Sequence, residues 1–425
     1  PAAPPRPRGA VPAPSPTLWR TLDARLGWLT GGPLPERFAR WDTPATTYYV
    51  LQGAVTLLVL VGLVMVLSSS FVESIDDDRA SYALAVKQAV FAAAGAVVLA
   101  VVSRVPIAWW RPALRLPALA VVGAAALQLL VFTPLGVEVG GNRNWIGVGG
   151  FTLQPSELVK LSAVLWCAAV LTHQRRHLHR LLPAVVPVAV GVGPGILLVL
   201  AGRDLGTSLV LGLVVAAALF VAGAPLRHLA ALAVPVLLAV AALVVADPDR
   251  LGRFASFTGG HTDAEGVGWQ SLHGLYALAS GGLTGVGLGA SREKWSWLPE
   301  AHNDFIFAIV GEELGLLGAL SVLALFAVVA WSCARVVRAS DDLFVKVLVG
   351  SVMAWVLGQA AINIAVVTGM APVVGVPLPL ISSGGSALLA TMAALGLVLA
   401  CVRSLPGASR ALRARPGLVR RSLAV

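Results

Sequence analysis

The sequence predicts an all-α polytopic membrane protein with about ten transmembrane helices, both termini in the cytoplasm, and one long extracytoplasmic loop between spans seven and eight. Of its 425 residues, 57% are hydrophobic and 12% are charged, whereas soluble domains carry about 25% charged residues. Apolar runs long enough to cross a bilayer recur along the chain. Basic residues gather in alternate connectors and in the two tails, as the positive-inside rule describes. The net charge of +10 therefore indicates membrane topology rather than nucleic-acid binding.

Three parts follow from this pattern. Residues 1–46 form a cytoplasmic tail rich in Pro and Arg, in which "TLWRTLDARLGWL" has leucines at helical spacing. That stretch is either an amphipathic helix on the membrane surface or a loosely ordered tail. Residues 47–404 form the transmembrane domain, and residues 405–425 form a basic cytoplasmic tail. We expect no cleavable signal peptide, because the first apolar run is long enough to remain as an anchor.

The expected orientation of the spans follows from the basic residues in the connectors between them. The predicted spans lie near residues 47–69, 84–103, 114–133, 157–172, 182–201, 206–223, 228–246, 310–334, 344–368 and 384–404. The fourth is short and begins at Pro155, a favourable residue for a first helical turn. The expected cytoplasmic connectors hold Arg104, Arg111, Arg115, Arg175, Arg176, Arg180, Arg227, Arg335, Arg338 and Lys346. On the other side, the loop from about 247 to 303 is expected to form short helices.

The cysteines carry no chemistry in this interpretation. Cys167, Cys333 and Cys401 are widely spaced and all lie in apolar runs. This spacing gives neither a metal site nor a disulfide framework, so we expect three buried thiols.

The stretch "WSWLPEAHNDFIFAIVGEELG" places charge directly against an apolar run. Ionisable residues at membrane depth are costly and mark functional sites by default. We expect Asp304 near the start of a helix that continues through residues 314–334, where the helix dipole favours its carboxylate. An ionised Asp facing an outer cavity is suited to act as a general base. The alternative is helix capping by Asn303 or Asp304. The other carboxylates are Glu300, Glu312 and Glu313.

Three further polar positions each admit two readings. Glu157 and Lys160 in "QPSELVK" lie on one helix face, either as an ion pair between helices or as a site for a polar, phosphate-bearing substrate. Asp204 in "GRDLGT" is a cavity residue or a turn residue. Arg143 in "GGNRNW" is a phosphate contact or an exposed interfacial arginine.

One uncharged segment is a candidate site, and several familiar motifs are incomplete or absent. The segment "LISSGGS" places Ser383, Gly384 and Gly385 before the last span, as an anion site at a helix N-terminus or as a flexible turn. Ser291 and Lys294 read S-x-x-K, but neither S-D-N nor K-T-G accompanies them. The sequence has no Walker A motif and no H-E-x-x-H motif, which leaves nucleotide-driven transport and zinc hydrolysis unsupported.

Four stretches together resemble one family. They are "GVGLGASREKWSWLPEAHNDFIFAIVGEELGLLG", "NRNWIGVGGFTLQPSELVK", "RDLGTSLVLG" and "PVVGVPLPLISSGGS". These resemble the signatures of the SEDS proteins (shape, elongation, division, sporulation; FtsW, RodA and SpoVE), over about residues 45–405. The form "LPEAHNDFIFAIVGEELG" looks more like the division branch, FtsW, than the elongation branch, RodA. The tail and the "HNDF" variant resemble actinobacterial members.

The resemblance implies an inverting glycosyltransferase that polymerises lipid II at the outer face of the bacterial cytoplasmic membrane, for septal wall synthesis. The family's catalytic carboxylate falls on Asp304, as the base that deprotonates the acceptor hydroxyl, with undecaprenyl pyrophosphate as leaving group. Glu157, Lys160 and Asp204 match polar positions of the family's central cavity, and Arg143 matches its loop arginine. The implied partners are a class B penicillin-binding protein and other division proteins.

Further expectations rest on the same resemblance. We expect substrate contacts from Glu300, His302, Ser383, Gly384 and Gly385. No cofactor is certain, although the remaining carboxylates are candidates to hold a divalent cation, Mg²⁺ or Mn²⁺. The sequence departs from the family pattern Q-P-D-L-G-T, because Gly202 and Arg203 stand where Gln and Pro are usual. The alternatives are a lipid II flippase, an elongation-type polymerase, and a scaffold that only recruits the transpeptidase.

Overall fold

The computed structural model describes residues 43–76, 82–111, 114–139, 141–148, 151–258, 268–295 and 297–413. The chain divides into two compact units, Pro1–Thr43 and Pro44–Val425. The fold described below belongs to the second unit. The predicted interfacial helix of the N-terminal tail and the basic residues 414–425 lie outside the described ranges.

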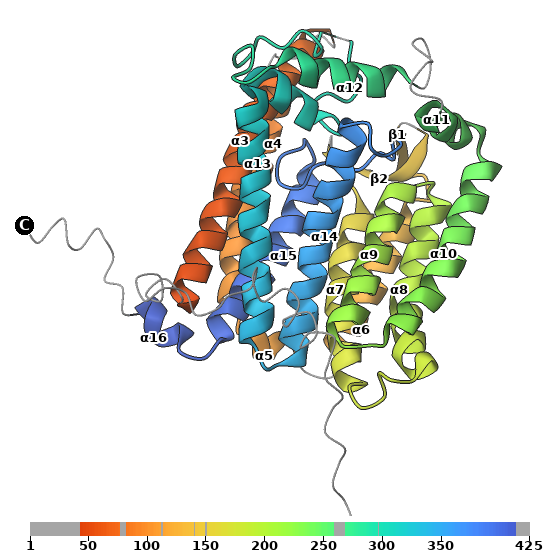
Figure 1. The fold of residues 1–425 in the computed structure, drawn as a ribbon. Helices are drawn as coiled ribbons and strands as arrows, with labels where there is room; N and C mark the ends of the chain where they lie inside the picture. Colours follow the sequence, from red (N-terminus) through yellow and green to blue (C-terminus); the bar gives the residue numbers. More distant parts are fainter. Residues whose placement is uncertain are drawn as a thin grey trace, which may run out of the picture. The chain divides into compact units, whose positions relative to one another are not determined.

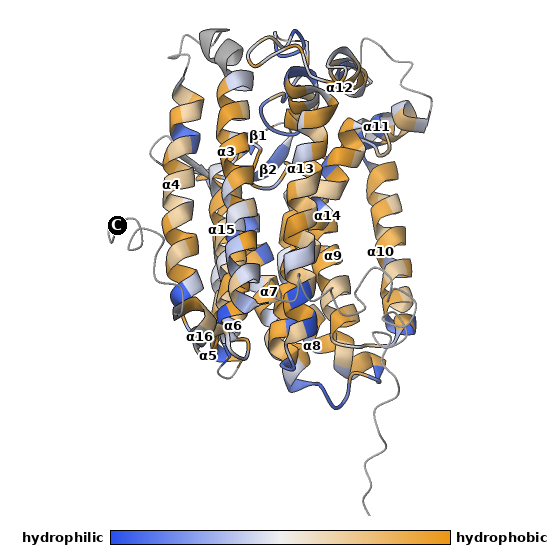
Figure 2. Cartoon of the chain, turned by 60° about the vertical axis from the view of Figure 1, so that its left-hand side comes forward, coloured by the Kyte–Doolittle hydropathy of each residue, from blue (hydrophilic) through white to orange (hydrophobic). Residues whose placement is uncertain are grey.

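The second unit is a helical bundle in which every predicted span corresponds to one apolar helix (Figure 1). These helices are α3 (Pro44–Asp76), α4 (Ala83–Arg104), α6 (Arg115–Leu130), α7 (Pro155–His173), α8 (Leu181–Ala201), α9 (Leu205–Val221), α10 (Leu226–Ala246), α13 (Ile306–Ala339), α14 (Leu343–Val367) and α15 (Gly385–Ser404). Within the described residues, 8 are long and apolar enough to cross a membrane, while α6 and α9 are shorter. Figure 2 shows apolar residues along almost the full length of these helices, with hydrophilic residues gathered near their ends. The chain is a multi-pass membrane protein.

Burial distinguishes central helices from peripheral ones. In the apolar window of α15, 78% of the residues are buried, compared with 6% in that of α10. Helix α15 packs on α4, and α14 packs on α9, α7 and α13. All three cysteines are buried and unpaired, as predicted. Helices α7, α14 and α15 have the most buried apolar windows, 72%, 61% and 78%, and therefore form the core of the bundle.

Loops, short helices and a small sheet gather at one end of the bundle (Figure 1). Strands β1 (Gly136–Val139), β2 (Asn142–Val148) and β3 (Phe151–Leu153) form an antiparallel sheet in the order β1-β2-β3. Helices α11 (Pro248–Thr258) and α12 (Trp269–Ser280) confirm the short helices predicted for the long loop. At the opposite end lie α5 (Ile107–Trp110) and α16 (Ala408–Arg413).

Helix α13 differs from the prediction of one uninterrupted helix. Gly315 has φ 67° and ψ −167°, which breaks the helix into two segments. The loop from 282 to 287 inserts at the break. Its amides at Val286 and Gly287 donate to the carbonyls of Glu312 and Glu313, and its carbonyls at 282 and 283 accept from the amides of 316 and 317. The backbone carbonyls and amides that lose their helical partners at the break are thus hydrogen-bonded to the loop, as buried backbone groups require.

Gly315→Ala should therefore lower the free energy of unfolding by about 2–4 kcal/mol. The backbone of Gly315 lies in a region that is essentially restricted to glycine. An added Cβ would also collide with backbone atoms of Leu283 and Gly285. Thermal unfolding of the purified protein in detergent measures the effect. The matched control is Gly212→Ala in α9, where a Cβ meets open space. Equal stability of the two variants would contradict the assignment of a strained break.

Candidate functional site

Asp304 lies in the turn that leads into α13, two residues before the helix begins at Ile306. The turn is closed by the amides of Asn303 and Phe305, which both donate to the carbonyl of Glu300. Glu300 itself has a positive φ of 55°. Asp304 is therefore near the helix start, as predicted, while Phe305 and not Asp304 occupies the N-cap position.

Three consecutive carbonyls of this turn are held from the C-terminal third of the chain. The amide of Ser383 donates to His302 O at 3.0 Å. Ser382 Oγ donates to Asn303 O at 2.7 Å, and Asn363 Nδ2 donates to Asp304 O at 2.7 Å. Asn363 also donates to Val376 O at 2.8 Å. Asn363 of α14 and the segment before α15 thus fix the backbone that carries Asp304. Among the described residues, the side chain of Asp304 has no hydrogen bond or ion pair and remains available.

The carboxyl group of Asp304 faces the loop between α14 and α15. Its Oδ2 lies 3.6 Å from the position of a Cβ on Gly375. Removal from water raises the pKa of Asp304 from 3.8 to about 7, and the nearby charges of Glu300 and Asp204 act in the same direction. His302 and Arg253 oppose this effect. Asp304 therefore titrates near neutral pH, where a general base works best.

Asp204 caps the N-terminus of α9. Its Oδ1 accepts from the amide of Thr207 at 2.8 Å, and its Oδ2 accepts from Gln154 Nε2 at 3.3 Å. Burial raises the pKa of Asp204, although these hydrogen bonds and the charge of Lys160 act against that rise. Asp204 thus has the turn role that the sequence allowed, and it also lies within electrostatic range of both Lys160 and Asp304.

Glu157 and Lys160 form a buried ion pair with a distance of 2.7 Å between Glu157 Oε1 and Lys160 Nζ. Lys160 Nζ also donates to Gln359 Oε1 at 3.0 Å and lies 5.0 Å from the ring centre of Trp355. Gln359 in turn donates to Pro377 O at 2.9 Å. Through Gln359, the pair therefore connects α7 to α14 and to the loop that faces Asp304. Of the two interpretations that the sequence allows, these contacts support the structural one. Its role in substrate binding stays a prediction.

Arg143 is tied to the backbone at the end of α6. Its Nε donates to Val131 O at 3.1 Å and its Nη2 donates to Thr133 O at 3.2 Å. Its amide donates to Gly202 O at 2.9 Å. These contacts position β2 against the α8–α9 turn, and they occupy much of the guanidinium. A phosphate contact by Arg143 stays a prediction.

The Ser–Gly segment before α15 packs closely rather than forming a loose turn. Gln88 of α4 donates to Ser382 O at 3.2 Å and accepts from the amide of Gly384 at 3.3 Å. A Cβ on Gly385 would collide with the ring of Phe91. The glycines thus allow α4 to approach the start of α15. A substrate contact by Ser383, Gly384 and Gly385 stays a prediction.

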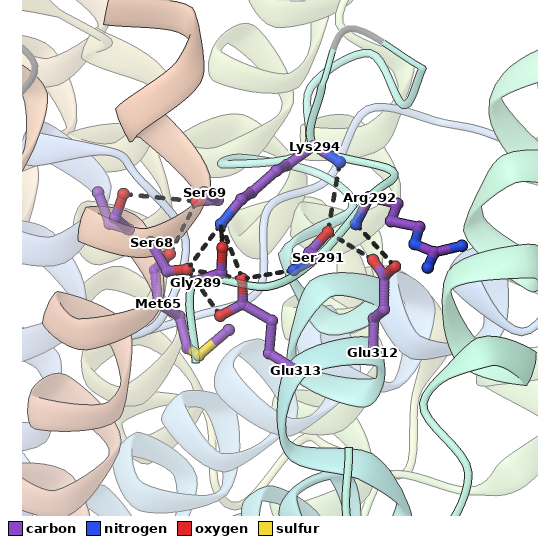
Figure 3. Close-up of polar contacts among 10 residues, drawn as sticks. Met65, Ser68, Ser69, Gly289, Ser291, Arg292, Lys294, Glu312 and Glu313 are labelled. Atoms are coloured by element: carbon purple, nitrogen blue, oxygen red, sulfur yellow. Dashed lines mark hydrogen bonds and ion pairs between the residues drawn. The ribbon is translucent and has the colours of Figure 1, made fainter. Parts of the chain in front are cut away.

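Glu312 and Glu313 belong to a separate buried cluster with Ser68, Ser291 and Lys294 (Figure 3). Lys294 Nζ lies 3.0 Å from Glu313 Oε1, and Ser68 Oγ donates to Glu313 Oε2 at 2.6 Å. Ser291 Oγ donates to Glu312 Oε2 at 2.5 Å. The carboxylate oxygens of Glu312 and Glu313 are already paired within this cluster, so its geometry does not favour them as ligands of a cation. Ser291 and Lys294 of the S-x-x-K motif thus anchor the loop before α13 to α3 and α13.

The described ranges contain no group of three or more His, Cys, Asp and Glu side chains arranged to hold a metal ion. The divalent cation suggested by the sequence stays a prediction.

Several residues at the site are not predicted from the sequence, because they are neutral amides or belong to the long loop. Asn363, Gln359 and Gln88 hold the turn of Asp304 and the loop opposite it. Their signal in the sequence is an amide inside an otherwise apolar helix, which is costly in lipid unless it is paired. Arg253, in α11, acts on Asp304 from the long loop.

Comparisons with known proteins agree on one assignment. The family FTSW_RODA_SPOVE, described as "Cell cycle protein", matches residues 49–405. The chain is 37% identical over 380 residues to "Probable peptidoglycan glycosyltransferase FtsW" of Mycobacterium tuberculosis, covering 89% of this chain and 72% of that protein. It is 36% identical over 358 residues to "Stage V sporulation protein E" of Bacillus subtilis, covering 84% and 97%.

Two solved structures share the fold. One chain comes from "Structural coordination of polymerization and crosslinking by a peptidoglycan synthase complex", with a TM-score of 0.68 and 26% identity over 84% of this chain and 97% of that one. The other is the rod shape determining protein RodA of Thermus thermophilus, with a TM-score of 0.59 and 27% identity over 84% of this chain and 96% of that one.

Proposed function

The chain belongs to the FtsW/RodA/SpoVE family, the SEDS proteins, and from this premise we propose that it polymerises lipid II with Asp304 as general base. It is a peptidoglycan glycosyltransferase, as are its FtsW relatives by name. The FtsW relatives of Mycobacterium also agree with the predicted division-branch, actinobacterial character. We assign this protein a role in septal wall synthesis.

The proposed reaction is a single displacement at the anomeric carbon of the donor. The acceptor sugar hydroxyl attacks that carbon, and Asp304 accepts the hydroxyl proton as the new C–O bond forms. The bond between the anomeric carbon and the diphosphate oxygen breaks, and its electron pair leaves with undecaprenyl diphosphate. Attack from the face opposite the leaving group inverts the configuration. No step in this scheme requires a metal ion.

One observation carries the proposal: the carboxyl group of Asp304 is free for chemistry while its backbone is fixed. Hydrogen bonds from Ser382, Ser383 and Asn363 hold the turn. A pKa of about 7 for Asp304 lets it ionise at neutral pH and still be basic enough to accept a proton. Fixed position and matched basicity are what general-base catalysis needs.

The pH dependence of the rate should follow the titration of Asp304. Its pKa is raised to about 7, so the active carboxylate is lost as the pH falls through about 7. We expect the turnover rate to be constant at high pH and to drop to about one tenth of its plateau at pH 6. Initial rates of lipid II polymerisation between pH 5.5 and 8.5 measure this.

A substitution of Glu300 tests whether the pH dependence of the rate reports the titration of Asp304. Because the charge of Glu300 raises the pKa of Asp304, Glu300→Gln should move the midpoint of the rate profile to lower pH. A wild-type rate that does not change across the range would contradict Asp304 as the base.

Orientation and partnership complete the proposal. The end of the bundle that holds Asp304 would face the outside of the cytoplasmic membrane, because the arginine-rich connectors lie at the other end of their helices.

A class B penicillin-binding protein would supply crosslinking. Support comes from the structural similarity to a chain of a peptidoglycan synthase complex.

The direct test is polymerisation of purified lipid II by the detergent-solubilised protein with its cognate transpeptidase. Glycan strands resolved on a gel are the expected result. A folded complex that makes no strands but moves lipid II across vesicle membranes would support a flippase instead. A folded complex with neither activity would support a scaffold.

A further inference from the structure

A cavity of about 70 Å³ opens beside the candidate site, between β2, the α8–α9 turn, α11 and the loop before α15. It is lined by Asn142, Arg203, Leu205, Val244, Arg250, Arg253, Phe254, Pro372, Val373 and Val374. About 10–15 Å³ in this measure holds one water, so the cavity has room for a phosphate-sized group. Three of its lining residues are arginines.

The three arginines differ in how they are engaged. Arg250 is committed to the fold, because its Nε lies 3.3 Å from Asp247 Oδ2 and its Nη2 donates to Arg203 O at 2.9 Å. In the part of the chain that the structure describes, the guanidinium groups of Arg203 and Arg253 have neither a hydrogen bond nor an ion pair. Both side chains are exposed at the cavity. Two cationic groups without protein partners therefore face one small space.

The backbone of Arg203 supports a role for its side chain. Arg203 has a φ of 65°, a left-handed conformation that Gly or Asn adopts more easily. Proline, by contrast, is fixed near −65° and cannot adopt this conformation. Strained backbone conformations of this kind cluster at active sites and at ligand-binding sites. The turn therefore places an arginine where the local conformation favours glycine.

The cavity also lies close to Asp304. Arg253 is within electrostatic range of the Asp304 carboxyl group and opposes the rise of its pKa. Leu205 begins α9 directly after Asp204, so the cavity and the acidic site share the same turn. A substrate whose reacting carbon lies at Asp304 can thus extend an anionic group into the cavity.

We propose that Arg203 and Arg253 form a binding site for the diphosphate group of the lipid-linked substrate. The inference rests on the proposed function and names the subsite that function would need. Guanidinium groups match phosphate oxygens in charge and in fork geometry. Asn142, which also lines the cavity, carries a neutral amide donor.

The first test measures binding of inorganic pyrophosphate to the purified protein by isothermal titration calorimetry. Arg203→Gly combined with Arg253→Gln should weaken binding at least tenfold. Arg203→Gly keeps the carbonyl that Arg250 binds and removes the strain at φ 65°, so the fold should be retained. The matched control is Arg292→Gln, an exposed arginine of the same end of the bundle that lies outside the cavity. Equal pyrophosphate binding by wild type and the double variant would overturn the proposal, as would no binding by wild type.

A second test separates the lipid-linked diphosphate from a free anion. Pyrophosphate should inhibit polymerisation competitively with lipid II, and the double variant should show a raised KM with a smaller change in kcat. Non-competitive inhibition would overturn the assignment to the substrate's diphosphate. If wild type binds pyrophosphate through these arginines but makes no glycan, the anion site stands and the proposed function fails.

Discussion

Lys160→Met is expected to lower the free energy of unfolding by about 3–5 kcal/mol, because it leaves the carboxylate of Glu157 buried without a counter-charge. The side chains of Lys160 and Glu157 are only 2% and 3% exposed. Within the described residues, Glu157 Oε2 has no hydrogen-bond partner. The ion pair is thus the principal compensation for that charge.

Thermal unfolding in detergent measures this effect, with Lys346→Met as the control for a lysine that is not buried. The double variant Glu157→Gln/Lys160→Met should recover much of the lost stability, since it removes both charges. Lys160→Met as stable as Lys346→Met would contradict a structural role. The double variant also separates the two readings of the pair, because a stable protein that fails to polymerise lipid II would assign Glu157 or Lys160 to the substrate.

The helices could be predicted from the sequence because hydrophobicity and length alone determine them in a membrane. Pro155 marked the start of α7 correctly. The break at Gly315 could not be predicted, because it depends on a loop from residues 282–287 that supplies its hydrogen bonds. Glycine in a helix interior does not by itself indicate a break.

The candidate site was predicted in part. Asp304 was found because a carboxylate beside an apolar run is unusual, and the structure shows it near the start of α13. Charge pattern alone could not separate it from Glu312 and Glu313, whose partners Ser68, Ser291 and Lys294 are brought together only by folding. The arginine-lined cavity likewise brings together Arg203 and Arg253, which are about fifty positions apart in the sequence. Pairings of this kind require the tertiary structure.

Asp304→Asn is expected to lower the rate of polymerisation by about 10²–10⁴-fold, the usual contribution of a general base. Asn has the same shape as Asp but cannot accept the hydroxyl proton. The turn should survive the change, because its contacts run through the backbone carbonyls of residues 302–304. Thermal unfolding and co-purification with the transpeptidase establish that the variant is folded and in complex.

The most direct measurement is polymerisation of purified lipid II by wild type and Asp304→Asn side by side, each in complex with the same transpeptidase. The account predicts glycan strands from wild type and a loss of at least 10²-fold from the variant. Strands formed at equal rates by both complexes would remove Asp304 from the chemistry and contradict the account.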